Sequence, residues 1–425
     1  MSFIDELRWR GMIHDMTPGT EELLKEKKVI GYIGFDPTAP SLTIGNLVQL
    51  MILRFFQKHG HTPVVLMGGA TGRIGDPSGK DKERQLKSPE ELDANLKRQT
   101  EQMKKLLDFE NGENKALLLN NYDFYKDMNV LDFLRDVGKN ITVNYMMSKD
   151  SVKNRLETGL SFTEFSYQLL QAYDFLYLYR HYDCVLQMGG SDQWGNITTG
   201  TEFIRRNIPG AKAYAVTTPL LTKSDGKKFG KSEEGNIWLD PEMTSPYKFY
   251  QFFINVDDAM TPKLMRYFSL KGKEEIESLE SQLADNPREY KKILAEELTR
   301  RIHSDAAFQS VMKVSDILFN KKATAEQLKE LTPDELETIA REIPSFQVSA
   351  GEIGQGVDIL NLISGLTSIV NSKSEGRRAI KSNALSVNKQ KIKDFDYRIM
   401  PEELLHGKYL MIENGKKNKF IVEFI

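Results

Sequence analysis

The sequence predicts an α/β fold built on a Rossmann-like, doubly wound parallel sheet, followed by a small all-α domain and a C-terminal α+β domain. In the first half of the chain, short apolar runs alternate with long amphipathic stretches, which is the pattern of strands joined by crossover helices. The second half turns helical after Trp238 and ends in a segment with a hairpin signal. With 425 residues the chain is too long for one ordinary core, so we expect two or three domains.

The expected strands are four apolar runs: Tyr32 to Phe35, Val64 to Met67, Ala116 to Leu119 and Cys184 to Met188. One intervening helix has a clear start, because Ser88 can cap it, Pro89 suits its first position and Glu91 completes a capping box. Residues of about 121–180 are expected to form a mostly helical insertion. We therefore assign residues 1–240 to one domain.

A helical domain is predicted over residues 241–320, with Thr244 or Ser245 before Pro246 as its start signal. Residues 321–356 are rich in Glu, Lys and Pro, and they are predicted to be a linker that contains one short capped helix.

The last domain, residues 357–425, is predicted to hold two helical stretches and a hairpin from Tyr409 to Phe424. Asn414-Gly415 is a strong turn signal for that hairpin. From Asn371 to the end there are 12 Lys or Arg against 7 Asp or Glu, whereas the whole chain has a net charge of −2. A basic module at one end of a near-neutral chain suggests a dedicated RNA contact and argues against a binder that covers nucleic acid with its whole surface.

The composition limits which classes of protein the chain can belong to. The chain is 40% hydrophobic and 28% charged, it has no apolar stretch long enough to cross a bilayer, and it starts without the features of a signal peptide, so we expect a cytoplasmic protein. Its one cysteine, Cys184, excludes an intramolecular disulfide. It lies in an apolar run and is read as core filling, with a catalytic thiol as the alternative.

Two segments far apart in the sequence predict a nucleotide site. The first, Phe35 to Asn46, follows an apolar run, breaks at two prolines and leads into a helical pattern. Such a strand, turn and helix direct backbone N–H groups and the positive end of a helix dipole at an anion. The second, Lys227 to Ser232, supplies lysines for the same anion; its alternative reading is a solvated run of charges.

These segments resemble the signature segments of class I aminoacyl-tRNA synthetases, which usually read His-Ile-Gly-His and Lys-Met-Ser-Lys-Ser. Here they read Thr43-Ile-Gly-Asn46 and Lys228-Phe-Gly-Lys-Ser232. Within that class the chain is similar to the bacterial-type tyrosyl-tRNA synthetases over nearly its whole length, through Tyr32 to Thr38, Gly68 to Lys80, Phe165 to Asp174 and Gly189 to Asn196. Ser374 to Lys381 resembles the helix start of the RNA-binding domain shared with ribosomal protein S4.

The resemblance implies a tyrosine–tRNA ligase. Such an enzyme activates L-tyrosine with ATP to tyrosyl-adenylate plus pyrophosphate and transfers tyrosine to the 3′-terminal adenosine of tRNA(Tyr). It also implies a homodimer formed with the help of the helical insertion, and Mg²⁺ that comes with ATP without a dedicated protein cage. The aromatic residues Phe124, Tyr125 and Phe133 are compatible with a dimer interface, and ordinary core is the alternative for each.

The site residues are implied by the same resemblance. The tyrosine pocket would be formed by Tyr32 and Asp174 at the phenol, by Asp76, Tyr167 and Gln171 at the ammonium group, by Gln193 at the carboxyl end and by Gln187 in support. ATP would contact Gly34, Asp36, Gly45, Gly190, Asp192 and Lys231. Phosphate contacts in catalysis would come from Thr38, Thr43, Asn46, Lys80, Arg84, Lys228, Lys231 and Ser232, and RNA contacts from Arg377, Arg378 and Lys381.

Some of these assignments can be weighed from the residues themselves. Tyr167, Gln171 and Asp174 are spaced i, i+4 and i+7 and share one helix face, which is either solvated or, with strongly apolar neighbours around it, the lining of a pocket. The glycine-rich segment from Gly68 to Lys80 fits neither the Walker pattern nor the dinucleotide fingerprint, so on its own it is equally a set of tight turns.

Three readings of the function compete. The first is the tyrosine–tRNA ligase. The second is a catalytically impaired RNA-binding protein on a synthetase scaffold, for which Thr43 in place of the usual histidine is the one hint. The third is an enzyme of the same architecture that activates tryptophan, against which Tyr32 and Asp174 favour a phenol.

Overall fold

A six-stranded sheet organises the first of the two units into which the chain folds. The computed structural model describes residues 1–78, 86–149, 152–153, 155, 159–223, 226–232, 235–415 and 418–425. One unit comprises Met1–Thr244 and Gln251–His303, and the other comprises Ser245–Tyr250 and Ser304–Ile425. None of the helices in these described ranges is long and apolar enough to cross a membrane.

The strand order of the sheet is β1-β6-β5-β2-β3-β4. Neighbours run parallel from β6 to β4, and only β1 pairs antiparallel, with β6. The strands are β1 (Asp15–Met16), β2 (Ile30–Phe35), β3 (Thr62–Met67), β4 (Leu117–Asn120), β5 (Cys184–Gly190) and β6 (Tyr214–Thr218). The predicted α/β fold with a parallel sheet is confirmed, and the third apolar run, Ala116 to Leu119, is shifted by one residue from the strand β4.

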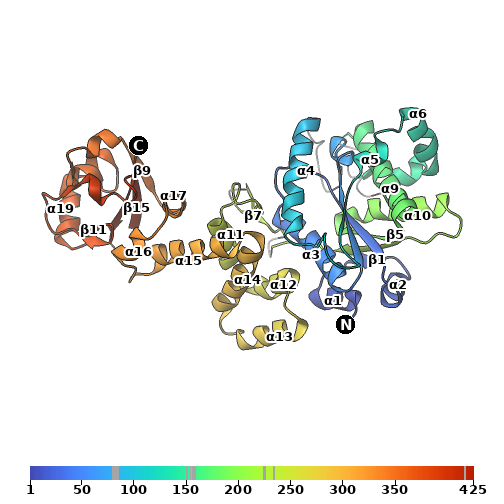
Figure 1. The fold of residues 1–425 in the computed structure, drawn as a ribbon, viewed down its shortest axis with the longest axis horizontal. Helices are drawn as coiled ribbons and strands as arrows, with labels where there is room; N and C mark the ends of the chain where they lie inside the picture. The colour runs from blue at the N-terminus through green and yellow to red at the C-terminus, as the bar shows by residue number, and fades with distance from the viewer. Residues whose placement is uncertain are drawn as a thin grey trace. The chain divides into compact units, whose positions relative to one another are not determined.

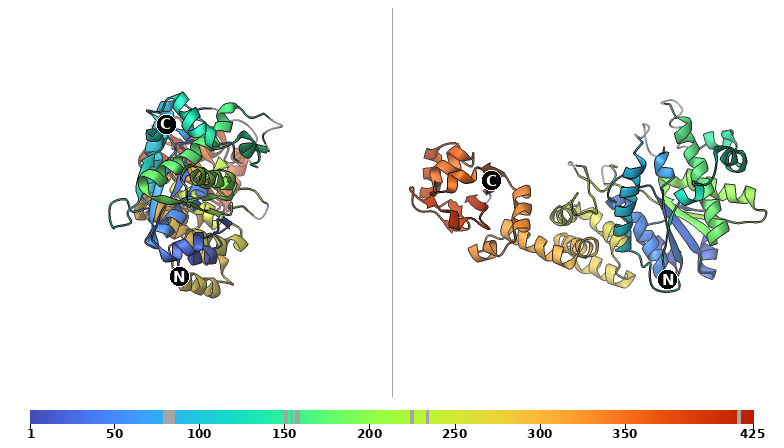
Figure 2. Two further views of the ribbon diagram at one scale, coloured as in Figure 1. Left: turned by 90° about the vertical axis from the view of Figure 1, so that its right-hand side faces the viewer. Right: turned by 45° about the horizontal axis from the view of Figure 1, so that its top comes forward.

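The direction in which the chain crosses the sheet reverses between β2 and β5. From β2 the chain passes through α3 (Ile44–Lys58) to β3 on one side, and from β5 it passes through α10 (Trp194–Asn207) to β6 on the other. Consequently α3 and α4 (Pro89–Lys104) cover one face of the sheet, and α9 (Phe162–Tyr182) and α10 cover the other (Figures 1 and 2). This arrangement opens a crevice at the carboxyl ends of β2 and β5.

The core between the sheet and α9 explains several sequence observations. Cys184 is fully buried there, and burial raises the pKa of its thiol, as expected for core filling. Phe124 is buried in the same core, and Tyr125 lies against it. The insertion is mostly helical, as predicted, with α5 (Tyr122–Tyr125), α6 (Val130–Asp132), η2 (Phe133–Val137), η3 (Gly138–Asn140), α7 (Val143–Met147) and α9.

Two short strands and a series of helices follow β6. The strands β7 (Lys231–Ser232) and β8 (Gly235–Asn236) pair antiparallel. The helices are α11 (Pro246–Ile254), η5 (Asp258–Met260), α12 (Thr261–Phe268), α13 (Lys273–Gln282) and α14 (Pro287–Ile302). The helical pattern begins at Pro246 as predicted.

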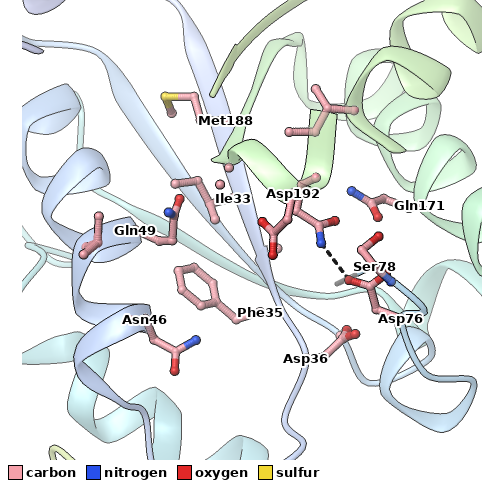
Figure 3. A pocket seen from close by; sticks show the side chains of 18 of the residues that line it. Ile33, Phe35, Asp36, Asn46, Gln49, Asp76, Ser78, Gln171, Met188 and Asp192 are labelled. Carbon is pink, nitrogen blue, oxygen red and sulfur yellow. Dashed lines mark hydrogen bonds between the residues drawn. The ribbon is translucent and has the colours of Figure 1, made fainter. Parts of the chain in front are cut away.

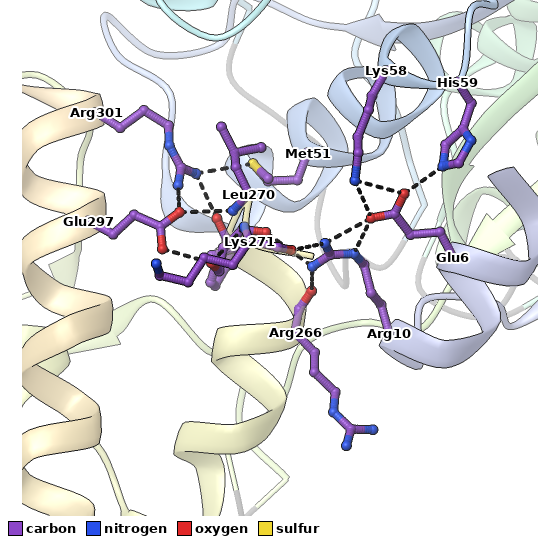
Figure 4. A network of polar contacts seen from close by, with 12 residues as sticks. Glu6, Arg10, Met51, Lys58, His59, Arg266, Leu270, Lys271, Glu297 and Arg301 are labelled. Carbon is purple, nitrogen blue, oxygen red and sulfur yellow. Dashed lines mark hydrogen bonds and ion pairs between the residues drawn. The ribbon is translucent and has the colours of Figure 1, made fainter. Parts of the chain in front are cut away.

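A buried ion pair on α1 (Phe3–Arg10) ties the N-terminus to two other elements of the first unit (Figure 4). Glu6 accepts from Arg10 Nη2 at 2.8 Å and from Lys58 Nζ at 3.0 Å, and its other oxygen lies 2.5 Å from His59 Nε2. Arg10 also donates to the carbonyls of Ser269 at 3.1 Å and Lys271 at 3.0 Å. The pair therefore joins α1 to the end of α3 and to the turn after α12.

The second unit is built on a five-stranded sheet in the order β12-β11-β14-β15-β9. Its strands are β9 (Ser345–Val348), β11 (Leu385–Val387), β12 (Gln390–Lys391), β14 (Tyr409–Asn414) and β15 (Asn418–Phe424), beside the separate pair β10 (Val357–Asp358) and β13 (Arg398–Ile399). The predicted hairpin is confirmed, because β14 and β15 pair antiparallel out to Asn414 opposite Asn418. Gly415, directly after Asn414, has a φ of 80°.

The helices of this unit are α15 (Asp305–Phe319), α16 (Ala325–Lys329), α17 (Pro333–Glu342), η6 (Ala350–Ile353), α18 (Ile359–Asn361), η7 (Leu362–Leu366), α19 (Lys373–Lys381) and η8 (Pro401–Glu403). Residues 321–356, for which we expected a linker, contain α16, α17 and β9, and β9 pairs parallel with β15. The domain boundaries themselves stay a prediction.

We predict that Glu6→Gln removes an acid-sensitive part of the stability. Its partners hold the pKa of the buried Glu6 carboxyl at about 2, below its ordinary value of 4.5. This stabilisation is therefore fully present above about pH 4.5 and is lost as the pH falls towards 2, and it is worth on the order of 3 kcal/mol. Urea unfolding at pH 7 and pH 3 measures it: the loss caused by the substitution should be larger at pH 7. An equal loss at both pH values would contradict the prediction.

Candidate functional site

A pocket of about 430 Å³ lies at the carboxyl ends of β2 and β5, where the direction of the sheet reverses (Figure 3). It brings together segments that are far apart in the sequence: the end of β2, the start of α3, the turn after β3, the polar face of α9, the turn after β5 and the lysine segment around residue 228. The predicted residues that line it are Tyr32, Gly34, Asp36, Thr38, Thr43, Gly45, Asn46, Asp76, Tyr167, Gln171, Asp174, Gln187, Gly190, Asp192, Gln193 and Lys228.

One end of the pocket is closed by a buried carboxylate. Asp174 accepts from Asn121 Nδ2 at 2.9 Å and from the Tyr125 hydroxyl at 2.7 Å. Burial raises the pKa of Asp174 to about 7, against these two hydrogen bonds, which favour the charged form. The charge of Asp174 and burial also raise the pKa of the Tyr32 hydroxyl well above 10, so this phenol stays protonated at neutral pH.

Three polar atoms around this end have no hydrogen-bond partner among the described residues: Tyr32 Oη, Gln171 Oε1 and Gln187 Oε1. A buried polar atom that lacks a partner costs about 1–3 kcal/mol, so folded proteins rarely keep several together without a reason. Tyr32 and Gln187 lie opposite each other on the paired strands β2 and β5. These atoms can satisfy a ligand that carries a hydroxyl group into the closed end.

The middle of the pocket carries two further carboxylates. Asp36 accepts from the Thr71 hydroxyl at 2.6 Å and from the Tyr167 hydroxyl at 2.9 Å. Asp76 accepts from Gln193 Nε2 at 2.7 Å and from the backbone N–H of Ser78 at 2.9 Å. Two carboxylates in one part of a pocket favour a cation there.

The turn after β3 allows no side chain at its first position. A Cβ built on Gly68 would lie 2.0 Å from Asp36 Oδ1 and 2.5 Å from Thr71 Oγ1. The glycine is therefore required for the hydrogen bond between Asp36 and Thr71. This part of the glycine-rich segment shapes the pocket in addition to making a turn.

The start of α3 forms the other end of the pocket. Thr43 and Asn46 make a capping box. The side-chain oxygen of Asn46, Oδ1, accepts from the Thr43 backbone N–H at 2.9 Å and from the Thr43 hydroxyl at 2.8 Å. Both side chains thus fix the first turn of the helix. The dipole of that turn favours an anion beside it.

The lysine segment folds against the same helix start. The Ile44 N–H donates to the Ile237 carbonyl at 3.3 Å, and the Ile237 N–H donates to the Gly230 carbonyl at 2.8 Å. Gly230 has a φ of 87°, and a Cβ on it would lie 3.1 Å from Ile44 Cβ, so glycine permits the close approach. The two signature segments, almost 200 residues apart in the sequence, therefore meet in space.

Not every predicted residue can be placed. Lys80 and Arg84 lie outside the described residues, as do the side chains of Lys231 and Ser232. Arg377, Arg378 and Lys381 are exposed on α19 in the second unit. Among the described residues there is no group of three or more His, Cys, Asp or Glu that could hold a metal ion.

Sequence reasoning missed the role of five polar residues that support the site: Thr71, Ser78, Asn121, Tyr125 and Asn196. Asn121 bridges Asp174 and Thr71, since its Nδ2 also lies 3.0 Å from the Thr71 hydroxyl. Tyr125 holds Asp174, and Ser78 contacts Asn196 at 3.2 Å beside Gln193. The one signal for Asn121 was its place two residues after a predicted strand, which is shared by many ordinary turns.

The chain is similar to known proteins over its full length. The family model described as "tRNA synthetases class I (W and Y)" matches residues 24–320, and the model described as "Tyrosine--tRNA ligase SYY-like C-terminal domain" matches residues 335–422. A tyrosine–tRNA ligase of Bacteroides fragilis is 51% identical over 99% of both chains, and one of Cytophaga hutchinsonii is 51% identical over 100% of this chain and 99% of its own. The crystal structure of a C-terminally truncated mitochondrial tyrosyl-tRNA synthetase of Aspergillus nidulans matches with a TM-score of 0.67 and 32% identity, covering 75% of this chain and 94% of that one.

We predict that Asp174→Asn stabilises the ligand-free protein at alkaline pH. Because the pKa of Asp174 is raised from 3.8 to about 7 in the folded state, its share of the stability is complete below about pH 4 and is lost as the pH rises through 7. An amide carries no charge to bury, so the variant escapes this loss. Thermal unfolding at pH 5 and pH 8 tests it: relative to the parent, the variant should gain more at pH 8. No difference between the two pH values would show that Asp174 is not strained by burial.

Proposed function

We propose how this pocket handles both substrates, on the premise that the chain belongs to the tyrosine–tRNA ligases, a family of class I aminoacyl-tRNA synthetases. The reaction joins the carboxylate of L-tyrosine to the α-phosphorus of ATP with release of pyrophosphate, and then passes the tyrosyl group to the 3′-terminal adenosine of tRNA(Tyr). The relatives at 51% identity are tyrosine enzymes, which favours tyrosine over tryptophan and an active ligase over an impaired RNA-binding protein.

The observation that carries the assignment is the closed polar end of the pocket. We assign the phenol of the substrate to Tyr32 and Asp174, because the Tyr32 hydroxyl has no hydrogen-bond partner in the described part of the chain and Asp174 is held by Asn121 and Tyr125. A phenol hydroxyl can donate to one of these groups and accept from the other. Phenylalanine would leave the Tyr32 hydroxyl unsatisfied and would bring an apolar ring edge against the buried Asp174 carboxylate, which is the physical basis of discrimination.

The amino and carboxyl groups of tyrosine are assigned to the middle of the pocket. The charge of Asp76, with Tyr167 and Gln171 nearby, suits the ammonium group, and Gln193 suits the carboxyl end. Gln187 supports the pocket from β5. Asp36, for which the sequence suggested an ATP contact, is bonded to Tyr167 and Thr71, so we place its charge between the two substrates.

ATP is assigned to the end of the pocket at α3. Asp192 and Gly190 suit the ribose. A Cβ at Gly190 would lie 2.7 Å from Asp192 Oδ1, so only glycine at this position avoids a clash with the carboxylate. Gly34, Gly45, Thr38, Thr43 and Asn46 surround the triphosphate, and Lys80, Arg84, Lys228, Lys231 and Ser232 complete the phosphate contacts. We propose that Mg²⁺ arrives bound to the phosphates and neutralises part of their charge.

Little covalent help is needed for activation. The tyrosine carboxylate is already ionised at neutral pH and attacks the α-phosphorus directly, so the protein contributes positioning and stabilises the charge that grows on the leaving pyrophosphate. Lys228 lines the pocket beside the start of α3, where that charge develops. The tRNA then enters with its 3′ end at the adenylate, which we expect to occur in the cytoplasm, where tRNA is used.

We also propose a homodimer formed through the helical insertion. Among the described residues of this insertion, the exposed large apolar side chains include Val130, Leu131, Leu134, Val143, Met147 and Phe162, with Phe162 at 75% and Leu131 at 73%. Exposed apolar residues gathered on one segment are typical of an interface. Sedimentation of the full chain tests the proposal, and a monomer at micromolar concentration would refute it.

We predict that Tyr32→Phe weakens the selectivity for tyrosine over phenylalanine by roughly tenfold, because one of the two groups that pair with the phenol is lost. The readout is kcat/KM for each amino acid in pyrophosphate exchange into ATP. Tyr290→Phe is the matched control, since the Tyr290 hydroxyl is also buried without a partner but lies on α14, outside the pocket. If the two variants had equal selectivity, the assignment of Tyr32 to the phenol of the substrate would be wrong.

We predict that reversing the charge of Arg377, Arg378 and Lys381 to Glu raises KM for tRNA and reduces its dependence on salt. These exposed side chains on α19 suit the phosphates of tRNA, and each phosphate contact contributes to the salt slope. Tyrosine-dependent pyrophosphate exchange, which needs no tRNA, should stay unchanged. Charging at 50 and 200 mM salt is the measurement, and an unaltered KM would exclude α19 as an RNA contact.

A further inference from the structure

Three amide side chains on α4 follow the loop that leads into the pocket. Asn95, Gln99 and Gln102 are spaced i, i+4 and i+7, which places them on one face of the helix. Asn95 Nδ2 donates to the Pro37 carbonyl at 3.0 Å, and Gln99 Nε2 donates to the Ala39 carbonyl at 2.7 Å. Gln102 Oε1 accepts from the Leu42 backbone N–H at 2.9 Å, so the three amides hold the loop at successive points.

The composition of the loop explains why it needs this support. Pro37 and Pro40 have no N–H group, so the loop cannot satisfy its own carbonyls with a regular ladder of hydrogen bonds. Asn95 and Gln99 are each 3% exposed, which means that water is no substitute donor around them. Since a carbonyl accepts only from an N–H or O–H group, the amide nitrogen of each side chain must face the loop.

Packing fixes the start of the same loop. A Cβ on Gly72 would lie 3.1 Å from Pro37 Cδ and 3.5 Å from a methyl group of Leu92 on α4, so Pro37 is enclosed between the turn after β3 and α4. At its other end, the loop runs into Thr43, the N-cap of α3. Both Thr38 and Thr43 line the pocket. The shape of this loop therefore decides where both threonines and the first turn of α3 lie.

We propose that Asn95, Gln99 and Gln102 are positioning residues for the activation step. They touch no substrate; they hold the backbone of 37–42 in the conformation that presents Thr38 and the start of α3 to the triphosphate. A site that must meet charge in the transition state loses rate when its groups move by about 1 Å. The inference rests on the proposed function, which places the triphosphate at this end of the pocket.

The test is Gln99→Met, which keeps the length and apolar volume of the side chain and removes the donor. We expect kcat/KM for ATP in tyrosine-dependent pyrophosphate exchange to fall roughly tenfold. KM for tyrosine should stay unchanged, because no tyrosine-binding residue lies on this loop. Gln102→Met is the second variant, at a position where the side chain is not fully buried, and it should act in the same direction with a smaller effect.

Gln57→Met is the matched control. Gln57 is also buried on a helix, at 7% exposure, and its Nε2 donates to the carbonyl of Asp108 at 2.7 Å, the same distance as in the pair of Gln99 with Ala39. The loop that Gln57 holds, around 108–114, contributes no residue to the pocket. Its loss should cost comparable thermal stability and leave the ATP parameters at the parent values.

The outcomes separate this inference from the function on which it rests. If Gln99→Met alters kcat/KM for ATP no more than Gln57→Met, or alters KM for tyrosine in parallel, the positioning role is overturned. Thr38→Ala is measured alongside. If Thr38→Ala lowers kcat/KM for ATP while Gln99→Met does not, only the positioning role is refuted. If both variants keep the parent kcat/KM for ATP, the proposed position of the triphosphate is refuted as well.

Discussion

The reversal of the sheet between β2 and β5 is the constraint from which the site follows. Since these neighbouring strands are parallel and their connections leave in opposite directions, a crevice opens at their carboxyl ends. Every loop that carries a polar group to the pocket ends or begins at this edge. The polar face of α9, just before β5, and the lysine segment, after β6, reach the same edge, so one topological feature gathers residues from 32 to 229 around a single cavity.

The same edge of the sheet also holds polar groups whose burial costs stability. Asp174 is a carboxylate with 2% exposure and a pKa of about 7, and the Tyr32 hydroxyl beside it has no partner among the described residues. An apolar core at that position would be more stable, yet it could not distinguish a phenol from a phenyl ring. At the opposite end of the first unit, the charge of Glu6 is fully paired and its pKa falls to about 2. Glu6 is paired with charged groups, whereas Asp174 is held by the neutral donors of Asn121 and Tyr125, and this contrast supports our proposal that Asp174 faces a ligand.

How much of the structure can be predicted from the sequence depends on how far apart in the sequence the interacting residues lie. The strands β2, β3 and β5 and the starts of α4 and α11 were predictable because an apolar run, or a cap followed by proline, is written in adjacent residues. Asn121 and Thr71 were not, because each looks like an ordinary turn residue until the fold places it beside Asp174 or Asp36. Likewise, β9 was hidden in an expected linker, since its pairing partner β15 lies more than 70 residues away. The substrate-site residues implied by the resemblance line one pocket wherever the structure describes them, and Lys80, Arg84 and the side chains of Lys231 and Ser232 lie outside the described residues.

The capping box of α3 gives a physical account of the unusual residue at position 43. Threonine is a good N-cap, and here its hydroxyl and its backbone N–H both bond to Asn46, which stiffens the first turn of the helix. A histidine could bring a donor to a phosphate, but it caps a helix poorly. Both donors of Thr43 are engaged by Asn46 Oδ1, and the Ile44 N–H is engaged by the Ile237 carbonyl, so a phosphate placed here, as we propose, would meet the Asn46 amide nitrogen, the Gly45 N–H and the helix dipole. Donors fixed to the helix start need the loop before the helix held firmly, and the buried amides of α4 provide that hold.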